Sequence, residues 1–110
     1  MARYGESFSL NLSVPIVTNA CHEAFREIGW PAKQSTTGFV FKEPFKLKLS
    51  QLLILKYPAT VRVDLAAESQ NSTLVNLRGS NFGFGPVQSN HVRKQVDDIR
   101  EAIRRQTGQP

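Results

Sequence analysis

The sequence is poor in the residues on which many catalytic and metal sites depend. Its 110 residues include one cysteine and two histidines. A single cysteine excludes an intrachain disulfide and a cysteine-based zinc site. Cys21 lies beside Ala20 and near Phe25, which is typical of a small core side chain. His22 and His91 have no His, Cys or carboxylate partner at metal-ligand spacing. We therefore expect no metal, no cofactor and no enzymatic activity.

Long hydrophobic runs are missing too. The longest, residues 52–55, contains four residues, whereas a helix needs ~20 to cross a bilayer. Residues 1–6 lack the apolar core of a signal peptide. From these absences we expect a soluble, cytoplasmic protein without a transmembrane segment.

The charge of the chain is only mildly biased. Lys and Arg number 14 against 9 Asp and Glu, which gives a formal net charge of +5. This excess favours anionic partners such as nucleic acid, acidic lipid head groups or acidic proteins, but it also serves solubility alone. Hydrophobic residues at 40% and charged residues at 21% indicate a globular protein. At this length we expect one domain over residues 1–110, with an ordered core of about residues 6–106 and short flexible termini.

The first third of the chain predicts a strand followed by a helix. Residues 7–14 alternate between polar and apolar, which is typical of a strand with one buried face. Pro15 ends this alternation and can open a helix. Apolar residues then recur at helical spacing over residues 17–28, and Gly29 is placed to end the helix.

The rest of the chain predicts further strands and a closing helix. Two short strands are expected at residues 33–36 and 39–43. The alternating runs 60–65 and 73–78 are joined by a short polar link, so they should form an antiparallel hairpin. Residues 88–106 carry an apolar stripe at helical spacing. The stripe consists of Val92, Val96, Ile99 and Ile103.

This order of elements predicts an α+β two-layer sandwich. We expect an antiparallel sheet of about five strands with two helices packed on one face. The other face should be polar and mildly basic. Its expected members include Ser7, Ser9, Asn11, Ser13, Thr60, Arg62 and Asp64.

A glycine-rich stretch, residues 79–86, joins the last predicted strand to the closing helix. Its three glycines and one proline suit a sharp turn, and we expect Phe82 and Phe84 to anchor this turn to the core. Gly83 and Gly85 precede a helix, where free amides favour an anion. However, these glycines do not match the spacing of a dinucleotide-binding motif, and Pro86 lacks the backbone amide that could donate to an anion. The alternative is that the glycines serve only to form the turn.

Two motifs and the order of elements resemble a known class of domain. Residues 28–30, Ile-Gly-Trp, end the first helix, and the Phe82–Pro86 stretch leads into the closing one. With the intervening strands they resemble small uncharacterised bacterial domains whose β-α-β(4)-α topology is similar to one repeat of the TATA-box-binding-protein fold. The resemblance implies a fold and no established activity. Residues 45–55 depart from the simplest form of that topology.

An apolar segment in the middle of the chain is the candidate interface. Surplus apolar area there can join two copies, dock on a partner protein, line a lipid-like pocket, or simply plug one end of the sheet. Periodicity does not decide whether residues 45–55 form a strand or a loop. We expect a non-catalytic module that binds a partner protein or a second copy of itself. A homodimer is favoured because a twofold contact can cover an exposed edge strand. The candidate interface residues are Phe45, Leu52, Leu53, Ile54, Leu55 and Tyr57.

Basic residues on the predicted strands supply the alternative function. If they share the open face, they suit the phosphates of nucleic acid or another anionic surface. The aromatic residues that stack on bases are missing from the polar strand positions, so the sequence favours protein association. Lysines on strands also prevent edge-to-edge aggregation, which needs no ligand. The candidate contacts are Lys46, Lys48, Arg62 and Arg78.

Overall fold

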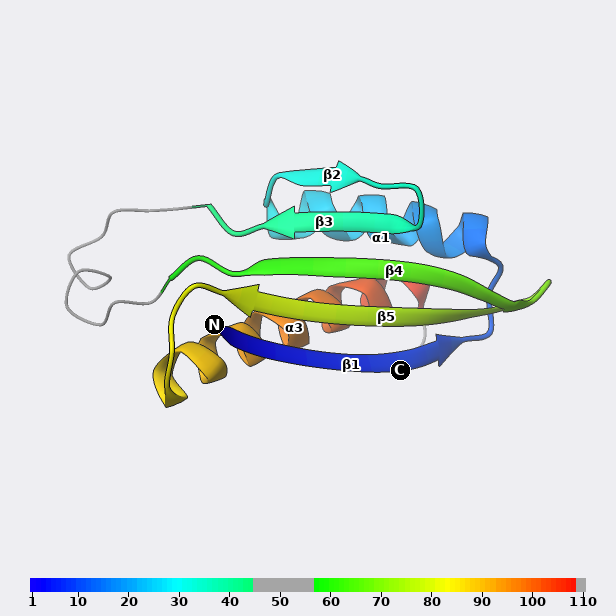
Figure 1. Ribbon diagram of the computed structural model, residues 1–110. Coiled ribbons are helices and arrows are strands. Elements are labelled where there is room, and N and C mark those ends of the chain that lie inside the picture. The colour runs from blue at the N-terminus through cyan, green and yellow to red at the C-terminus, as the bar shows by residue number, and fades with distance from the viewer. Residues whose placement is uncertain (45–56, 109–110) are drawn as a thin grey trace.

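The computed structural model describes residues 1–44 and 57–108. It contains a five-stranded antiparallel sheet with the strand order β1-β5-β4-β3-β2, and both helices lie on one face of that sheet (Figure 1). Along the chain the elements are β1 Ala2–Leu10, α1 Val14–Ile28, β2 Ala32–Gln34, β3 Gly38–Lys42, β4 Thr60–Ser69, β5 Ser72–Asn81 and α3 Pro86–Thr107. The predicted α+β class and the β-α-β(4)-α order are therefore confirmed.

Strand β1 begins and ends earlier than its alternation predicts. It pairs with β5 from Ala2, opposite Asn81, to Leu10, opposite Thr73. Because β5 begins at Ser72, which Asn11 would face, residues from Leu12 onward have no partner on β5. The polar–apolar alternation continues to residue 14, but its last residue already belongs to α1. The predicted strand at residues 7–14 was therefore too long at its C-terminal end, and its start was also wrong, because β1 begins at Ala2.

Helix α1 follows the predicted pattern closely. Pro15 lies in its first turn, and the Gly29 amide donates to the Phe25 carbonyl at 2.8 Å to end it. The stripe residues Val17 and Cys21 are fully buried against the sheet. Burial raises the pKa of the Cys21 thiol to about 12, so this side chain is a core residue, as its neighbours indicated.

The predicted hairpin is present, and the two predicted short strands pair as a second one. Strands β2 and β3 pair from Ala32, opposite Phe41, to Gln34, opposite Phe39. Strands β4 and β5 pair over a longer stretch than the alternating runs suggested, up to Ser69 opposite Ser72. The predicted polar link at residues 68–72 is thus mostly strand. Cross-strand pairing can continue beyond the buried residues because backbone hydrogen bonds do not require an apolar side chain.

Helix α3 completes the core. All residues of its predicted stripe are fully buried. All but Val92, which packs with Ala2 and Ala59, share one cluster with alternate side chains of the strands. The stripe residues are Val92, Val96, Ile99 and Ile103, and the strand residues include Val61, Val63, Val75 and Leu77. No helix within the described residues has the length and apolar character needed to cross a membrane. The core therefore lies entirely between the helices and one sheet face, and the other face stays open.

Candidate functional site

A first row of cross-strand partners crosses the open face near one end of the sheet. Arg3 on β1 lies opposite Ser80 on β5. Thr60 on β4 lies opposite Ser80 and continues the row to Lys42 on β3. Directly opposite residues of antiparallel strands point to the same face, so this row carries a cation near each of its ends.

The next row brings two arginines into direct opposition. Arg78 on β5 lies opposite Arg62 on β4. The row continues through Val40 on β3 to Lys33 on β2. Neighbouring strands lie ~4.8 Å apart, so the backbones of Arg62 and Arg78 are only one strand spacing from each other. Like charges in this position repel.

We call this set of exposed cations the basic face. Its members are Arg3, Lys33, Lys42, Arg62 and Arg78. Within residues 1–44 and 57–108, none of them forms an ion pair, in contrast to arginines on the helix side of the molecule. There Arg100 binds Glu6 at 2.9 Å and Arg105 binds Glu27. The positive charge of the open face is therefore not neutralised by the described part of the chain.

Acidic side chains on the open face come from β4, and the nearer one, Asp64, is a neighbour of Arg62. Asp64 lies one row beyond Arg62, and its Oδ1 accepts a hydrogen bond from Thr37 Oγ1 at 2.9 Å. Glu68 lies near the β4–β5 turn, about 20 Å along the strand from Arg62 at ~3.3 Å per residue. This distance is about twice the Debye length, which is ~10 Å at 0.1 M salt. Glu68 is therefore too distant to neutralise the charge of the basic face.

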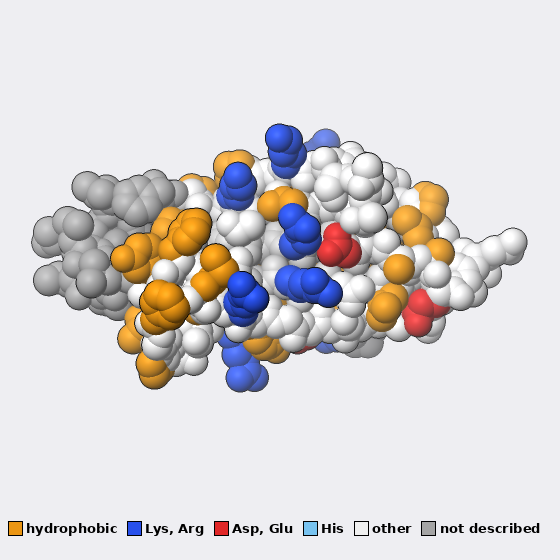
Figure 2. Space-filling model, viewed as in Figure 1, with side chains coloured by type: hydrophobic (Ala, Val, Ile, Leu, Met, Phe, Trp, Pro, Cys, Tyr) orange, Lys and Arg blue, Asp and Glu red, His pale blue; other side chains and the backbone are white. Residues whose placement is uncertain are grey.

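A shallow hollow of about 550 Å³ lies on this face. Arg3, Arg62 and Arg78 line it together with the hydroxyl side chains of Thr60 and Ser80. Figure 2 shows Lys and Arg side chains gathered along the middle of the face, and apolar side chains gathered toward the end of the sheet from which β5 leads to α3. Guanidinium groups in such an arrangement present forked donors to phosphate or carboxylate oxygens.

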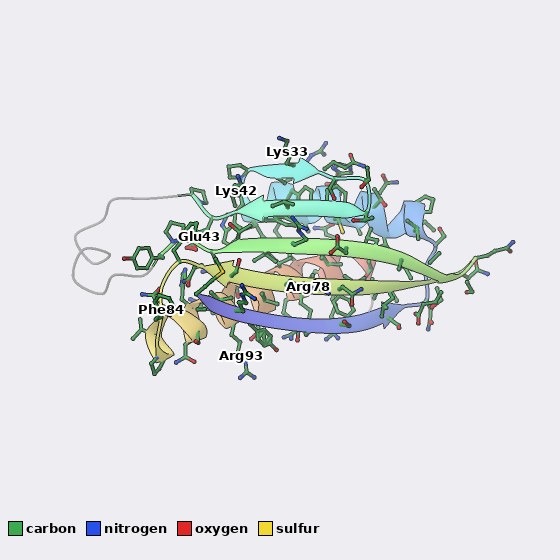
Figure 3. The ribbon with its side chains drawn as sticks, viewed as in Figure 1. Lys33, Lys42, Glu43, Arg78, Phe84 and Arg93 are labelled. Atoms are coloured by element: carbon green, nitrogen blue, oxygen red, sulfur yellow. The ribbon has the colours of Figure 1, made fainter. Side chains whose placement is uncertain are left out.

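The apolar residues at that end include two unexpectedly exposed phenylalanines. We call residues 82–85, between β5 and α3, the aromatic loop. Phe82 is 78% exposed and Phe84 is 83% exposed. The expectation that they anchor the loop to the core was wrong. Figure 3 shows Phe84 at the same end of the sheet as Lys42 and Glu43.

Polar side chains anchor the loop instead. Asn81 is 4% exposed, and its Nδ2 donates to Gln88 Oε1 at 3.1 Å and to the Tyr57 carbonyl at 3.3 Å. Asn81 Oδ1 accepts from the Gly83 amide at 3.2 Å, and Gln88 Oε1 accepts from the Tyr57 amide at 3.1 Å. With these polar groups paired, the loop is held without burying either phenylalanine.

Gly83 is the buried residue of the aromatic loop, and it lies against Gln88 and Tyr57. An ideal Cβ at this position would lie 2.6 Å from Gln88 Cδ and 2.9 Å from Tyr57 Cδ2. A side chain here would therefore displace Gln88 or Tyr57, and Gly83 is buried between its exposed neighbours Phe82 and Phe84. Alternation of a buried glycine with two outward phenylalanines is what exposes both rings.

Near the aromatic loop, the end of β3 is joined to the start of β4 by hydrogen bonds between Glu43 and Ala59. The Glu43 amide donates to the Ala59 carbonyl at 2.9 Å, and the Ala59 amide donates to Glu43 Oε2 at 2.8 Å. His91 Nε2 on α3 lies 2.7 Å from the same Glu43 oxygen. Glu43 therefore links β3, β4 and α3 close to where Tyr57 meets the loop.

The candidate residues from the sequence divide into two groups. Arg62 and Arg78 are brought together as direct partners, and Tyr57 is 45% exposed. The Gly83 amide already donates to Asn81, so anion binding by Gly83 and Gly85 stays a prediction with few free donors. The other candidates lie outside the described residues: Phe45, Lys46, Lys48, Leu52, Leu53, Ile54 and Leu55.

Sequence reasoning missed four residues of this surface. Arg3 precedes the predicted start of its strand, and Lys33 was assigned to a strand but not to the face. Phe82 and Phe84 were assigned to the core because phenylalanine is usually buried. No local signal reveals this, because Asn81 and Gln88 hold the loop through contacts with Tyr57, which is distant along the chain.

The described residues offer no alternative site of metal chemistry. No group of three or more His, Cys, Asp or Glu side chains within residues 1–44 and 57–108 is arranged to hold a metal ion. The open face, with its cations and aromatic rings, is thus the most distinctive described surface. Comparison with models of known protein families gives no match, and comparison with curated proteins gives none at a significant level.

Proposed function

We propose that the protein binds nucleic acid through its basic face, with the cations contacting phosphate groups. The observation that carries this proposal is the direct opposition of Arg62 and Arg78, which lack ion-pair partners among the described residues and are flanked by Arg3, Lys33 and Lys42. Phosphate contacts of this kind depend on charge and position and are independent of base sequence.

Protection of sheet edges does not account for this arrangement. Cations on edge strands block aggregation, which suffices for Arg3 on β1 and Lys33 on β2. Arg62 and Arg78 lie on β4 and β5, the inner strands of the sheet. There, like charges in direct opposition destabilise the fold, and an anion between them would remove that repulsion.

Solubility is also a weaker explanation. A soluble surface intersperses charges of both signs, as on α3, where Arg100 lies 3.1 Å from Asp97 and 3.0 Å from Glu101. On the basic face, in contrast, five cations outnumber their nearest acidic neighbour, Asp64, and no ion pair among the described residues joins it to them. Such an excess of one sign raises the local potential and attracts polyanions.

The test is a titration of a labelled oligonucleotide of about 20 nucleotides, longer than the ~4–16 nucleotides that single-strand binding folds typically cover. Fluorescence anisotropy at salt concentrations from about 50 to about 200 mM gives the salt dependence. If all five cations of the basic face contact phosphates, the slope of log K against log salt should be about −3.5 on a single strand and about −4.5 on a duplex.

Variants distinguish the basic face from net charge alone. Arg62→Glu with Arg78→Glu should abolish binding. Arg26→Glu with Lys94→Glu changes the net charge equally but alters exposed residues of α1 and α3, so it should keep most of the affinity. Equal losses in both double variants, or a wild-type protein that binds no oligonucleotide at low salt, would contradict the proposal.

A further inference from the structure

We infer that the aromatic loop makes this protein selective for single-stranded nucleic acid, with Phe82 and Phe84 stacking on unpaired bases. The inference rests on the proposed function of the basic face and assigns a second kind of contact to it. Phosphates would lie on the cations of the sheet, and bases would reach the rings at its end.

The exposure of the two rings needs an explanation. Phe82 and Phe84 leave 78% and 83% of their surface in water, although phenylalanine is among the residues most often buried. The exposure is built into the loop, because Gly83 fills the inner position and Asn81 occupies the anchoring one. Val87, on the first turn of α3, adds a third apolar side chain that is 47% exposed. Exposed apolar groups gathered in this way mark a binding surface.

The loop is also held in place before any partner arrives. Asn81 bonds Gln88, Gly83 and the Tyr57 carbonyl, while the Tyr57 amide bonds Gln88. Both anchoring side chains are about 95% buried, with exposures of 4% and 5%. A loop fixed in this way loses little conformational entropy when its rings are covered.

The rings continue the line of the cations along β5. Strand β5 ends at Asn81, so Phe82 follows the strand directly and is two residues beyond Ser80, which belongs to the row of Arg3 and Lys42. Arg78, in the next row, is two residues further back along β5. A linear polyanion lying across the rows toward the loop would therefore meet arginines and lysines first and phenylalanines at its end.

A single strand fits this line better than a duplex or a membrane. Bases in a duplex are already stacked on one another, whereas unpaired bases are free to stack on aromatic side chains. A loop inserted into a bilayer needs its cations at the level of the head groups, close to the inserted side chains. Here the nearest basic residues along the chain are Arg78 and Arg93, and the sheet rows recede from the loop.

The experiment compares four probes at one salt concentration. They are a mixed-sequence single strand, an abasic strand of equal length with the same phosphates, the duplex, and vesicles of phosphatidylcholine with phosphatidylserine. Phe82→Ala and Phe84→Ala should each weaken binding of the single strand about 5- to 150-fold, the range for loss of one base–aromatic stack. Binding of the abasic strand and the duplex should change less than about twofold, and the salt slope on the single strand should stay the same, because the cations are intact.

Matched controls keep the result interpretable. Ile16→Ala removes an exposed apolar side chain from the start of α1, at the opposite end of β1 from the aromatic loop, and it should leave single-strand affinity unchanged. Because both rings are mostly exposed, their replacement removes little buried area and should preserve the unfolding midpoint. In a second measurement, Phe84→Trp should lose fluorescence on adding the single strand but not the abasic strand, with the Trp30 signal of the wild type subtracted.

The outcomes separate this inference from the function on which it rests. Nucleic-acid binding that depends on Arg62 and Arg78 but not on the phenylalanines would overturn the inference and leave the proposed function standing. Equal losses on the normal and abasic strands would also overturn it. Vesicle binding that requires the phenylalanines, with single-strand binding unaffected, would assign the loop to a membrane surface. Binding to no nucleic-acid probe would overturn both proposals.

Discussion

At position 21 the fold encloses a thiol between α1 and the sheet. Cys21 is fully buried, and burial raises its pKa to about 12. Because the thiolate is the reactive form, the native protein should resist iodoacetamide at pH ~8, at which a free cysteine with a pKa of ~8.5 reacts. Mass spectrometry should show labelling only in denaturant. Rapid labelling of the native protein would mean that α1 opens readily from the sheet.

Gly83 is the position at which the aromatic loop tolerates least change. Gly83→Ala would bring a methyl group within 2.6 Å of Gln88 Cδ, which displaces the side chain that bonds Asn81 and Tyr57. We expect a loss of ~1–3 kcal/mol in the free energy of unfolding, measured with urea. Gly5→Ala is the control, because its added methyl group would approach the Leu77 carbonyl oxygen at an ordinary 3.4 Å. Similar losses in both variants would argue against a specific clash.

The exposure of Phe82 and Phe84 was beyond sequence reasoning for a physical reason. Two phenylalanines spaced by one residue fit either a buried or an exposed strand edge, and burial is the common outcome. The decision came from Asn81 and Gln88, which meet the backbone of Tyr57. Asn81 and Gln88 are 24 and 31 positions away from Tyr57 along the chain. A pattern of neighbouring residues cannot predict contacts over such a separation.

At the scale of elements, the two helices are joined at their C-terminal ends by charge. Glu27 on α1 accepts hydrogen bonds from Arg105 Nε at 2.9 Å and from Gln106 Nε2 at 3.2 Å. These bonds hold the pKa of Glu27 below its ordinary value of 4.5. A carboxyl group with a lowered folded-state pKa adds stability above its unfolded pKa and loses that contribution as the pH falls through the folded value.

This link predicts a specific pH dependence. Glu27→Gln should be less stable than the wild type near neutral pH, and the difference should shrink as the pH falls below about 4.5. Urea unfolding at a series of pH values measures it. Glu23→Gln, on the same helix, is a control, because its partner Arg26 is a neighbour on α1 and joins no second element. A difference for Glu27→Gln that persists unchanged into acid would show that the ion pair does not contribute.

Helices were easier to predict than strand ends. A helix carries its own periodicity, so the buried stripe of α3 was visible in full. A strand ends where its partner does, and β1 stops with the start of β5. At its other end, Glu6 occupies an inward position because Arg100 on α3 reaches it at 2.9 Å. A charged residue at that position breaks the alternation by which the strand would have been recognised.

On the scale of the whole molecule, association through the apolar segment stays a prediction. Of the candidate interface, only Tyr57 lies within the described residues, where it is 45% exposed. If the segment joins two copies, light scattering should give a dimer at both about 0.1 and about 0.5 M salt, since apolar contacts are not screened as surface charges are. Leu53→Asp should then produce a monomer. A monomeric wild type at both concentrations would remove self-association.

The hydrogen bonds between Glu43 and Ala59 have a further consequence for the connectivity of the chain. The ends of the intervening segment are fixed side by side by two bonds between these residues, and His91 supports Glu43 from α3. The sheet therefore does not depend on the length of that segment for its register. Doubling the length of a loop adds only ~0.6 kcal/mol of closure entropy. We therefore expect the fold to accept insertions or a shorter replacement between Glu43 and Ala59.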